Sequence, residues 1–138
     1  MDETARLMAR EIPRLRRYAT TLTGDVDEAD DLVQDALERA MRKRHLWRGS
    51  GSIRSWLYRV VFSVFANQAR QRRRRRAELA LEAAPTPAAA ARQEDMAACR
   101  DIAEAMARLP LEQRAAIALT AVEGVAYDEA AAILGVPI

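Results

Sequence analysis

The segment DVDEADDLVQDALERAMRKR, residues 25–44, carries the clearest helical pattern of the chain. Asp25 is placed to cap a helix, and Glu28 follows three residues later, as in a capping box. Apolar residues then recur at spacings of three and four, as the buried face of a helix requires. These residues are Ala29, Leu32, Val33, Ala36, Leu37, Ala40 and Met41. The segment therefore predicts a helix from Asp25 to about Leu46 that packs one face against other helices.

The opposite side of this predicted helix is acidic. Its outward positions share one face at helical spacing, and we call them the acidic face: Asp31, Gln34, Asp35 and Glu38. Three bases, residues 42–44, follow at the C-terminal end. One interpretation is that these charges only stabilise the helix through its dipole. The other is that the acidic face docks on a basic protein partner while the basic end lies roughly 20–25 Å away.

The segments on either side of residues 25–44 also predict helices. One apolar stripe precedes Gly24, and Pro13 within it should start a fresh helix or kink one. The stripe consists of Met8, Ile12, Leu15, Ala19 and Leu22. Beyond a glycine-containing loop, Ser52 can cap another helix that runs into ARQRRRRRAE, residues 69–78. Its predicted buried residues are Ile53, Trp56, Leu57, Val60, Val61 and Val64.

The composition changes after Arg76. Residues 77–95, AELALEAAPTPAAAARQED, are rich in alanine, contain two prolines and indicate a linker. Helical patterns resume over residues 96–109, 111–122 and 128–134. The sequence thus predicts an all-α fold of two small helical domains, residues 1–76 and 96–138, joined by a flexible linker.

Composition excludes several functional classes. The chain of 138 residues has a single cysteine and a single histidine, so we expect neither a disulfide framework nor a zinc site, and no other metal or cofactor. No apolar stretch approaches the roughly 20 residues that span a bilayer, and no signal-peptide pattern occurs, which indicates a cytoplasmic protein without membrane insertion. No nucleophile–base pair or phosphate-binding glycine motif is recognisable, so we expect no enzymatic activity.

Charge is segregated along the chain. The net charge is only +2, but residues 25–38 contain seven acids and no base, whereas residues 39–76 contain thirteen bases and no acid. A merely soluble surface usually intersperses its signs. Five of the bases form an unbroken arginine run, Arg72–Arg76. A disordered, solvated tail is one interpretation, but mutual repulsion and counterion release favour contact with a polyanion.

Aromatic residues are interleaved with the bases, which is typical of surfaces that bind single-stranded nucleic acid. Trp56 lies on the apolar stripe and is more a core residue than a base contact, whereas Tyr58 is off the stripe and is the better candidate for stacking. Trp47 and the glycine loop could hold an extruded base or form an ordinary connection. The candidate nucleic-acid contacts are Arg48, Arg54, Trp56, Tyr58, Arg59, Asn67, Arg70, Arg72, Arg73, Arg74, Arg75 and Arg76.

Three motifs together resemble a known family. EADDLVQDALERA (residues 28–40), IRSWLYRVV (53–61) and RQRRRRR (70–76) are similar to the second conserved region of bacterial RNA polymerase sigma factors, and above all to the extracytoplasmic-function (ECF) group. LPLEQRAAIALTAVEGVAYDEAAAILGVPI (109–138) resembles the start of the fourth region, a helix-turn-helix. The resemblance implies a sigma region 2 domain over residues 1–76, a linker over 77–95 and a partial region 4 over 96–138.

The resemblance also implies partners. Asp31, Leu32, Gln34 and Asp35 would meet the clamp helices of the largest subunit of core RNA polymerase, and Glu38 is assigned with them. The glycine loop and the third helix would recognise the minus-ten element of promoter DNA and hold it open. An anti-sigma protein is a further expected partner, and we expect a monomer outside these complexes.

Two departures from the family keep an alternative open. Many family members have Arg-Asn where this chain has Phe62-Ser63, and the chain stops in the turn before the recognition helix that reads duplex DNA. Both favour a sigma-like decoy that binds an anti-sigma protein without initiating transcription. The arginine run and the DDLVQD motif favour a sigma factor that directs core polymerase to promoters. A general single-strand binder is a third, more distant possibility.

Overall fold

The computed structural model describes residues 2–47, 51–79 and 97–135, and the regular elements in these ranges are helices. This confirms the predicted all-α class. Their order along the chain is α1 (Glu3–Thr23), α2 (Val26–Arg42), η1 (Arg44–Leu46), α3 (Ile53–Glu78), α4 (Ala97–Ala107), α5 (Leu111–Ile117), η3 (Ala118–Val122) and α6 (Tyr127–Leu134). In the described part of the chain, no helix is both long and apolar enough to cross a membrane.

The predicted caps are present. The Asp25 carboxylate accepts a hydrogen bond from the backbone N–H of Glu28 at 2.9 Å, and the Ser52 hydroxyl accepts one from that of Ser55 at 3.0 Å. Gly24 ends α1 in the left-handed conformation, with φ at 79°. These local signals set where α2 and α3 begin.

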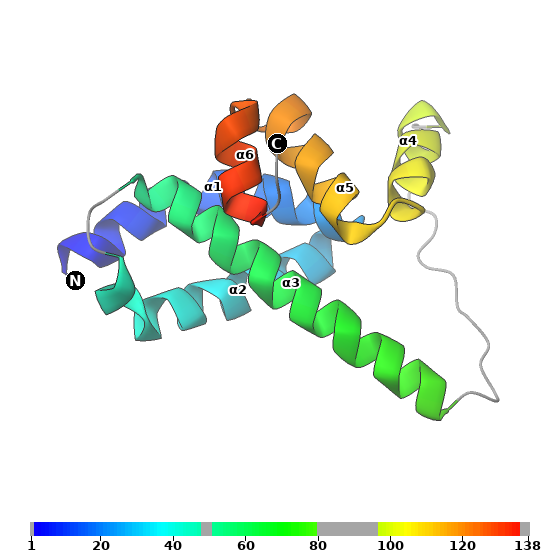
Figure 1. Cartoon of the computed structure of the whole chain (residues 1–138), viewed down its shortest axis with the longest axis horizontal. Helices are drawn as coiled ribbons and strands as arrows, with labels where there is room; N and C mark the ends of the chain where they lie inside the picture. Colours follow the sequence, from blue (N-terminus) through cyan, green and yellow to red (C-terminus); the bar gives the residue numbers. More distant parts are fainter. Residues whose placement is uncertain (1, 48–50, 80–96, 136–138) are drawn as a thin grey trace.

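Two helices continue through residues that disfavour a helix, and for α3 this continuation is as predicted. A fresh helix at Pro13 is wrong, because α1 continues through this residue. The missing N–H of Pro13 removes one helical bond, but the buried side chains of Met8 and Leu15 hold the helix on both sides of it. Likewise α3 extends through the whole arginine run to Glu78, and this end protrudes beyond the other helices (Figure 1).

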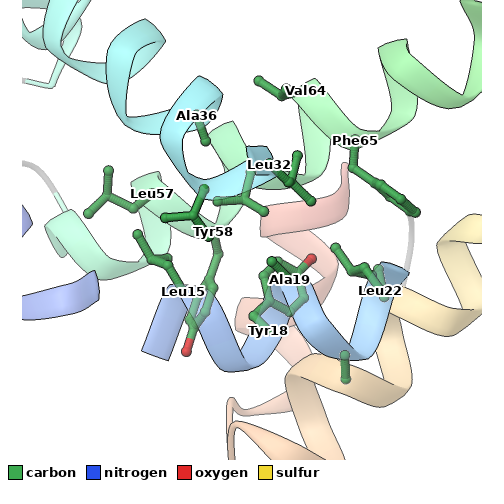
Figure 2. Close-up of a cluster of buried hydrophobic side chains, with 14 of the residues drawn as sticks. Leu15, Tyr18, Ala19, Leu22, Leu32, Ala36, Leu57, Tyr58, Val64 and Phe65 are labelled. Carbon is green, nitrogen blue, oxygen red and sulfur yellow. The ribbon is translucent and has the colours of Figure 1, made fainter. Parts of the chain in front are cut away.

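Helices α1, α2 and α3 pack against one another and form the N-terminal bundle. Leu15, Tyr18 and Leu22 of α1 meet Leu32 of α2 and Leu57 of α3 in its centre (Figure 2). Burial of such side chains is the main source of stability for helices of this length.

A second group, the C-terminal helices α5, η3 and α6, packs on this bundle. Helices α5 and η3 lie against α1, and α6 lies against α3 (Figure 1). Their buried residues belong to the same cluster as those of the bundle: Ala115, Ala118, Leu119, Ala130 and Ile133. The cluster thus crosses the domain boundary that the sequence predicts.

Candidate functional site

The acidic face of α2 is open to solvent, but Leu32, which is predicted to dock together with it, is not. Asp31, Gln34, Asp35 and Glu38 are exposed, as expected for docking. Leu32, by contrast, is 1% exposed, because it belongs to the apolar stripe that α2 turns toward the core. A direct contact of Leu32 with a partner stays a prediction, and in this structure the side chain is not available for it.

The acidic face and the arginine run do not lie on opposite sides of the molecule. Glu28, Asp31 and Asp35 of α2 line an open groove whose other wall is α3. The α3 wall consists of Gln68, Gln71, Arg72 and Arg75. The Gln68 side-chain amide donates to the Asp35 carboxylate at 3.0 Å. The helix α3 crosses α2 and so brings part of the arginine run beside the acids, an arrangement that the charge pattern along the sequence does not indicate.

The arginine run nevertheless stays available. All five of its side chains are exposed, and none of the ion pairs found among the described residues involves them. Arg72 and Arg75 share the helical face that lines the groove, whereas Arg73, Arg74 and Arg76 are not among its lining residues. The run therefore presents positive charge both to the groove and to open solvent.

The first half of α3 differs most from the prediction. Tyr58 was expected to stack on a base, but its ring is 1% exposed. It packs edge-on against Tyr18, with ring centroids 5.0 Å apart and planes at 74°. The ring is not accessible in this arrangement because α3 is covered on two sides, by α2 and by α1 with the C-terminal helices. Stacking of Tyr58 on a base stays a prediction.

Arg54 and Arg59, two neighbouring candidate contacts on α3, are exposed but already hydrogen-bonded within the chain. The Arg54 guanidinium donates to Glu11 at 2.7 Å, and Arg59 donates to the backbone carbonyl of Ala132 at 3.3 Å. Trp56 is half-buried against the core.

The remaining candidate nucleic-acid contacts lie in the second half of α3 and in or beside the glycine loop. Arg70 is exposed and donates to the half-buried Asn67. The Trp47 indole N–H donates to the carbonyl of Gly51 at 3.4 Å. Arg48 and the rest of the glycine loop, residues 48–50, lie outside the described residues.

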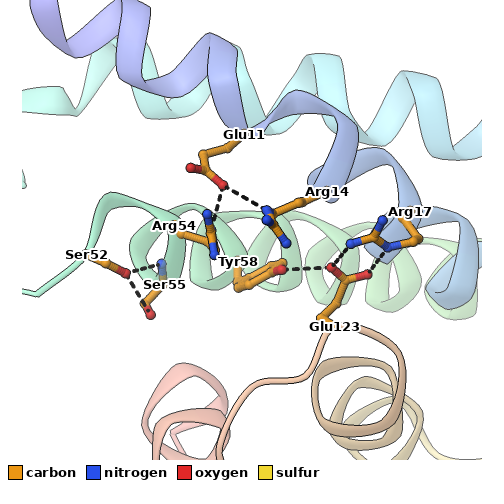
Figure 3. Close-up of polar contacts among 8 residues, drawn as sticks. All are labelled: Glu11, Arg14, Arg17, Ser52, Arg54, Ser55, Tyr58 and Glu123. Carbon is orange, nitrogen blue, oxygen red and sulfur yellow. Dashed lines mark hydrogen bonds and ion pairs between the residues drawn. The ribbon is translucent and has the colours of Figure 1, made fainter.

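One carboxylate that the sequence did not indicate lies at the centre of a polar cluster (Figure 3). Glu123 accepts two hydrogen bonds from the Arg17 guanidinium, both at 2.9 Å, and one from the Tyr58 hydroxyl, also at 2.9 Å. Its side chain is 0% exposed. Hydrogen bonding to Glu123 and its negative charge raise the pKa of Arg17, and burial raises the pKa of Tyr58. In the sequence Glu123 is a lone glutamate before a glycine, and nothing in this pattern predicts its contacts with Arg17 and Tyr58.

Tyr18, next to this cluster, is the basis of a stability prediction. Its hydroxyl is buried and has no hydrogen-bond partner among the described residues. Because an unsatisfied buried hydroxyl is destabilising, Tyr18→Phe should raise the free energy of unfolding by about 1 kcal/mol, measured by urea denaturation. The matched change Tyr58→Phe, which removes a hydroxyl that is bonded, should lower it. A loss of stability in Tyr18→Phe would show that this hydroxyl is satisfied.

Comparisons with known proteins agree with this arrangement. Residues 8–62 match the family described as the sigma2 domain of PhyR, and residues 99–138 match sigma-70, region 4. The two matches fall on the N-terminal bundle and on the C-terminal helices. The chain therefore carries the two regions, 2 and 4, that sigma factors share.

Two curated relatives show which group of sigma factors the chain belongs to. The chain is 32% identical to the ECF RNA polymerase sigma factor EcfG of Rhodopseudomonas palustris over 90% of its own length and 68% of that protein. It is 31% identical to the ECF RNA polymerase sigma factor SigE of Mycolicibacterium smegmatis, over 96% of the chain and 53% of that protein. The chain thus spans between about half and two thirds of these relatives, and it belongs to the ECF RNA polymerase sigma factors.

A solved structure is similar over both groups of helices. The sigma factor RpoE of Bartonella quintana, determined in complex with the anti-sigma factor NepR, matches with a TM-score of 0.82 and 28% identity. The match covers 99% of this chain and 86% of that one. The packing of the C-terminal helices on the bundle is therefore part of what the two proteins share.

Proposed function

We propose that this chain directs core RNA polymerase to promoters, with α2 docking on the polymerase and α3 holding the opened minus-ten strand. The observation that supports this most is that the exposed carboxylates of the acidic face and the exposed arginine run lie on adjacent helices in a member of the ECF family. This role is binding rather than catalysis, and its partners operate in the cytoplasm.

The groove between α2 and α3, with a volume of about 310 Å³, suits side chains that project from a helix of the polymerase clamp. Asp31 and Asp35 on one wall would attract basic residues of that helix, and Arg72 and Arg75 on the other would attract acidic ones. Such complementarity fixes the register of docking more than it adds affinity. Gln68 would help by holding the Asp35 carboxylate in place.

The remaining arginines suit the DNA strand. Arg73, Arg74 and Arg76 are exposed on the protruding end of α3, where a phosphate backbone can approach. Neutralising phosphates releases counterions, which drives binding without reading sequence. Bases of a melted strand would then be captured near the start of α3, where Trp56 is half-buried and Tyr58 would become accessible once the C-terminal helices move away.

Docking of α2 is tested by Asp35→Arg. We expect affinity for purified core polymerase to fall at least tenfold, since about 1.4 kcal/mol corresponds to each factor of ten and charge reversal at a docking site exceeds this. Competition binding would measure the effect, and far-UV circular dichroism would confirm intact helices. Asp101→Arg is the matched control, because Asp101 is exposed on α4, away from the groove. Equal affinities of the two variants would contradict docking through α2.

A decoy role remains the second candidate function. The observation that favours it is that Phe62, which stands where many ECF members have arginine, packs against the core and is not displayed to DNA. In the decoy role the partner is an anti-sigma protein, and a sigma factor would also be bound by such a protein. Promoter-dependent transcription by core polymerase with this chain supports the sigma role. Polymerase binding without any transcript, together with tight anti-sigma binding, supports the decoy.

A further inference from the structure

The C-terminal helices are attached to the N-terminal bundle through a set of polar contacts that converge on α1 and α3. Glu123 makes the central ones, to Arg17 and Tyr58 (Figure 3). The others join Ser55 to Glu129, Arg59 to the carbonyl of Ala132, and Arg114 to the carbonyl of Leu22 at 2.8 Å. We call this packing the closed arrangement.

The backbone turns sharply on both sides of Glu123, and its side chain lies toward α1 and α3. The preceding turn, η3, is a π-helix, and the N–H of Glu123 closes it by donating to the carbonyl of Ala118 at 2.9 Å. Gly124 follows in the left-handed conformation with φ at 74°, which reverses the chain at once. π-helical turns are rare and often occur at functional positions.

The closed arrangement covers the face of α3 that is proposed to receive the DNA strand. Ser55, Tyr58 and Arg59 are α3 residues that hydrogen-bond to the C-terminal part of the chain. Of these, Tyr58 and Arg59 are also candidate nucleic-acid contacts. A strand stacked on Tyr58 and the C-terminal helices cannot occupy this face together.

The free energy of the closed arrangement should be only slightly lower than that of an open arrangement. The C-terminal helices contribute two large buried apolar side chains to the shared cluster, Leu119 and Ile133, and their other buried residues there are alanines, so the apolar area gained is moderate. The ion pair of Glu123 with Arg17 is half-exposed on the arginine side and contributes modestly, but removing the Glu123 charge would leave buried bonding groups without their partner. The Tyr18 hydroxyl and Arg114 Nε are buried without partners among the described residues, and opening would return both to water.

We infer that Glu123 is the residue that keeps the chain closed, and that single-stranded DNA and the C-terminal helices compete for the same face of α3. The inference rests on the proposed DNA contact of α3, but it adds a control by the chain itself. Removing the Glu123 charge should therefore strengthen DNA binding, although Glu123 touches no DNA in this scheme.

Glu123→Gln tests the inference when compared with Glu112→Gln. Glu112 is exposed on α5 and belongs to none of the ion pairs among the described residues, so both variants lose one negative charge but only one loses the closed contact. We expect Glu123→Gln to bind a fluorescein-labelled oligothymidine about tenfold more tightly than Glu112→Gln, because the binding-competent fraction rises. Equal affinities of the two variants would overturn the inference.

Hydrogen exchange gives a readout that does not depend on DNA. In Glu123→Gln the amides of α6 should exchange faster while those of α2 stay protected, and Glu112→Gln should resemble the parent chain. Unchanged protection of α6 would overturn the inference even if DNA affinity rose. If no variant binds oligothymidine but α6 is released, the proposed DNA role fails and the closing role of Glu123 stands.

Tyr58→Phe supplies a milder variant that keeps the ring and its packing. It removes a single bond to Glu123 and should increase oligothymidine affinity by about two- to threefold, in the same direction as Glu123→Gln. A decrease would mean that the hydroxyl contacts DNA rather than closing the chain, which would also count against the inference.

Discussion

Changing all five residues of the arginine run, Arg72–Arg76, to glutamine should lower affinity for a single-stranded promoter-like oligonucleotide by roughly 100-fold in dilute salt. The run is exposed and unpaired with acids among the described residues, so its charge is free to meet phosphates. Without polymerase in the groove all five arginines can meet phosphates, and each lost contact lowers the logarithmic salt slope by about 0.7 for single strands, which gives a reduction of about 3.5 for the whole run. Fluorescence anisotropy titrations at several salt concentrations measure both quantities.

The matched control is the chain with lysine at the same five positions. Lysine keeps the charge and the helix propensity but loses the planar guanidinium, so the salt slope should stay close to that of the parent. An unchanged slope in the glutamine variant would make the run a bystander. A lysine variant as weak as the glutamine variant would point to specific guanidinium geometry instead of counterion release.

The arginine run also illustrates what the sequence could predict. Local signals were sufficient for α2 and α3: the caps at Asp25 and Ser52 and the three-four spacing of apolar residues are properties of neighbouring residues. Charge segregation along the chain was equally visible. Its arrangement in space was not, because the crossing of α3 over α2 places Arg72 and Arg75 beside Asp31 and Asp35.

Tyr58 and Glu123 show a second limit. A periodic pattern identifies the stripe that faces one neighbour, but α3 is covered on two sides, so a residue off the stripe is also buried. Whether Tyr58 is covered depends on helices about sixty residues later in the chain. No local spacing encodes such a contact, and the ion pair of Glu123 with Arg17, 106 positions apart, is invisible for the same reason.

The largest loss of stability is expected at Leu15. This residue is 0% exposed and lies in the buried cluster between α1, α2 and α3 (Figure 2). Leu15→Ala removes buried methyl groups and leaves a cavity that closely packed helices fill only in part, so the free energy of unfolding should fall by about 2–5 kcal/mol. For a small chain with a total stability of about 5–15 kcal/mol, this shifts the urea midpoint far downward.

Ile102→Ala is the control for the Leu15 variant. Ile102 is also aliphatic, but it is 64% exposed on α4, so its truncation should change stability by no more than about 0.5 kcal/mol. Because the C-terminal helices share the buried cluster, Leu15→Ala should also speed hydrogen exchange in α6, which lies about 110 residues further along the chain. A variant that loses the bundle while α6 stays protected would show that the C-terminal helices hold their structure independently.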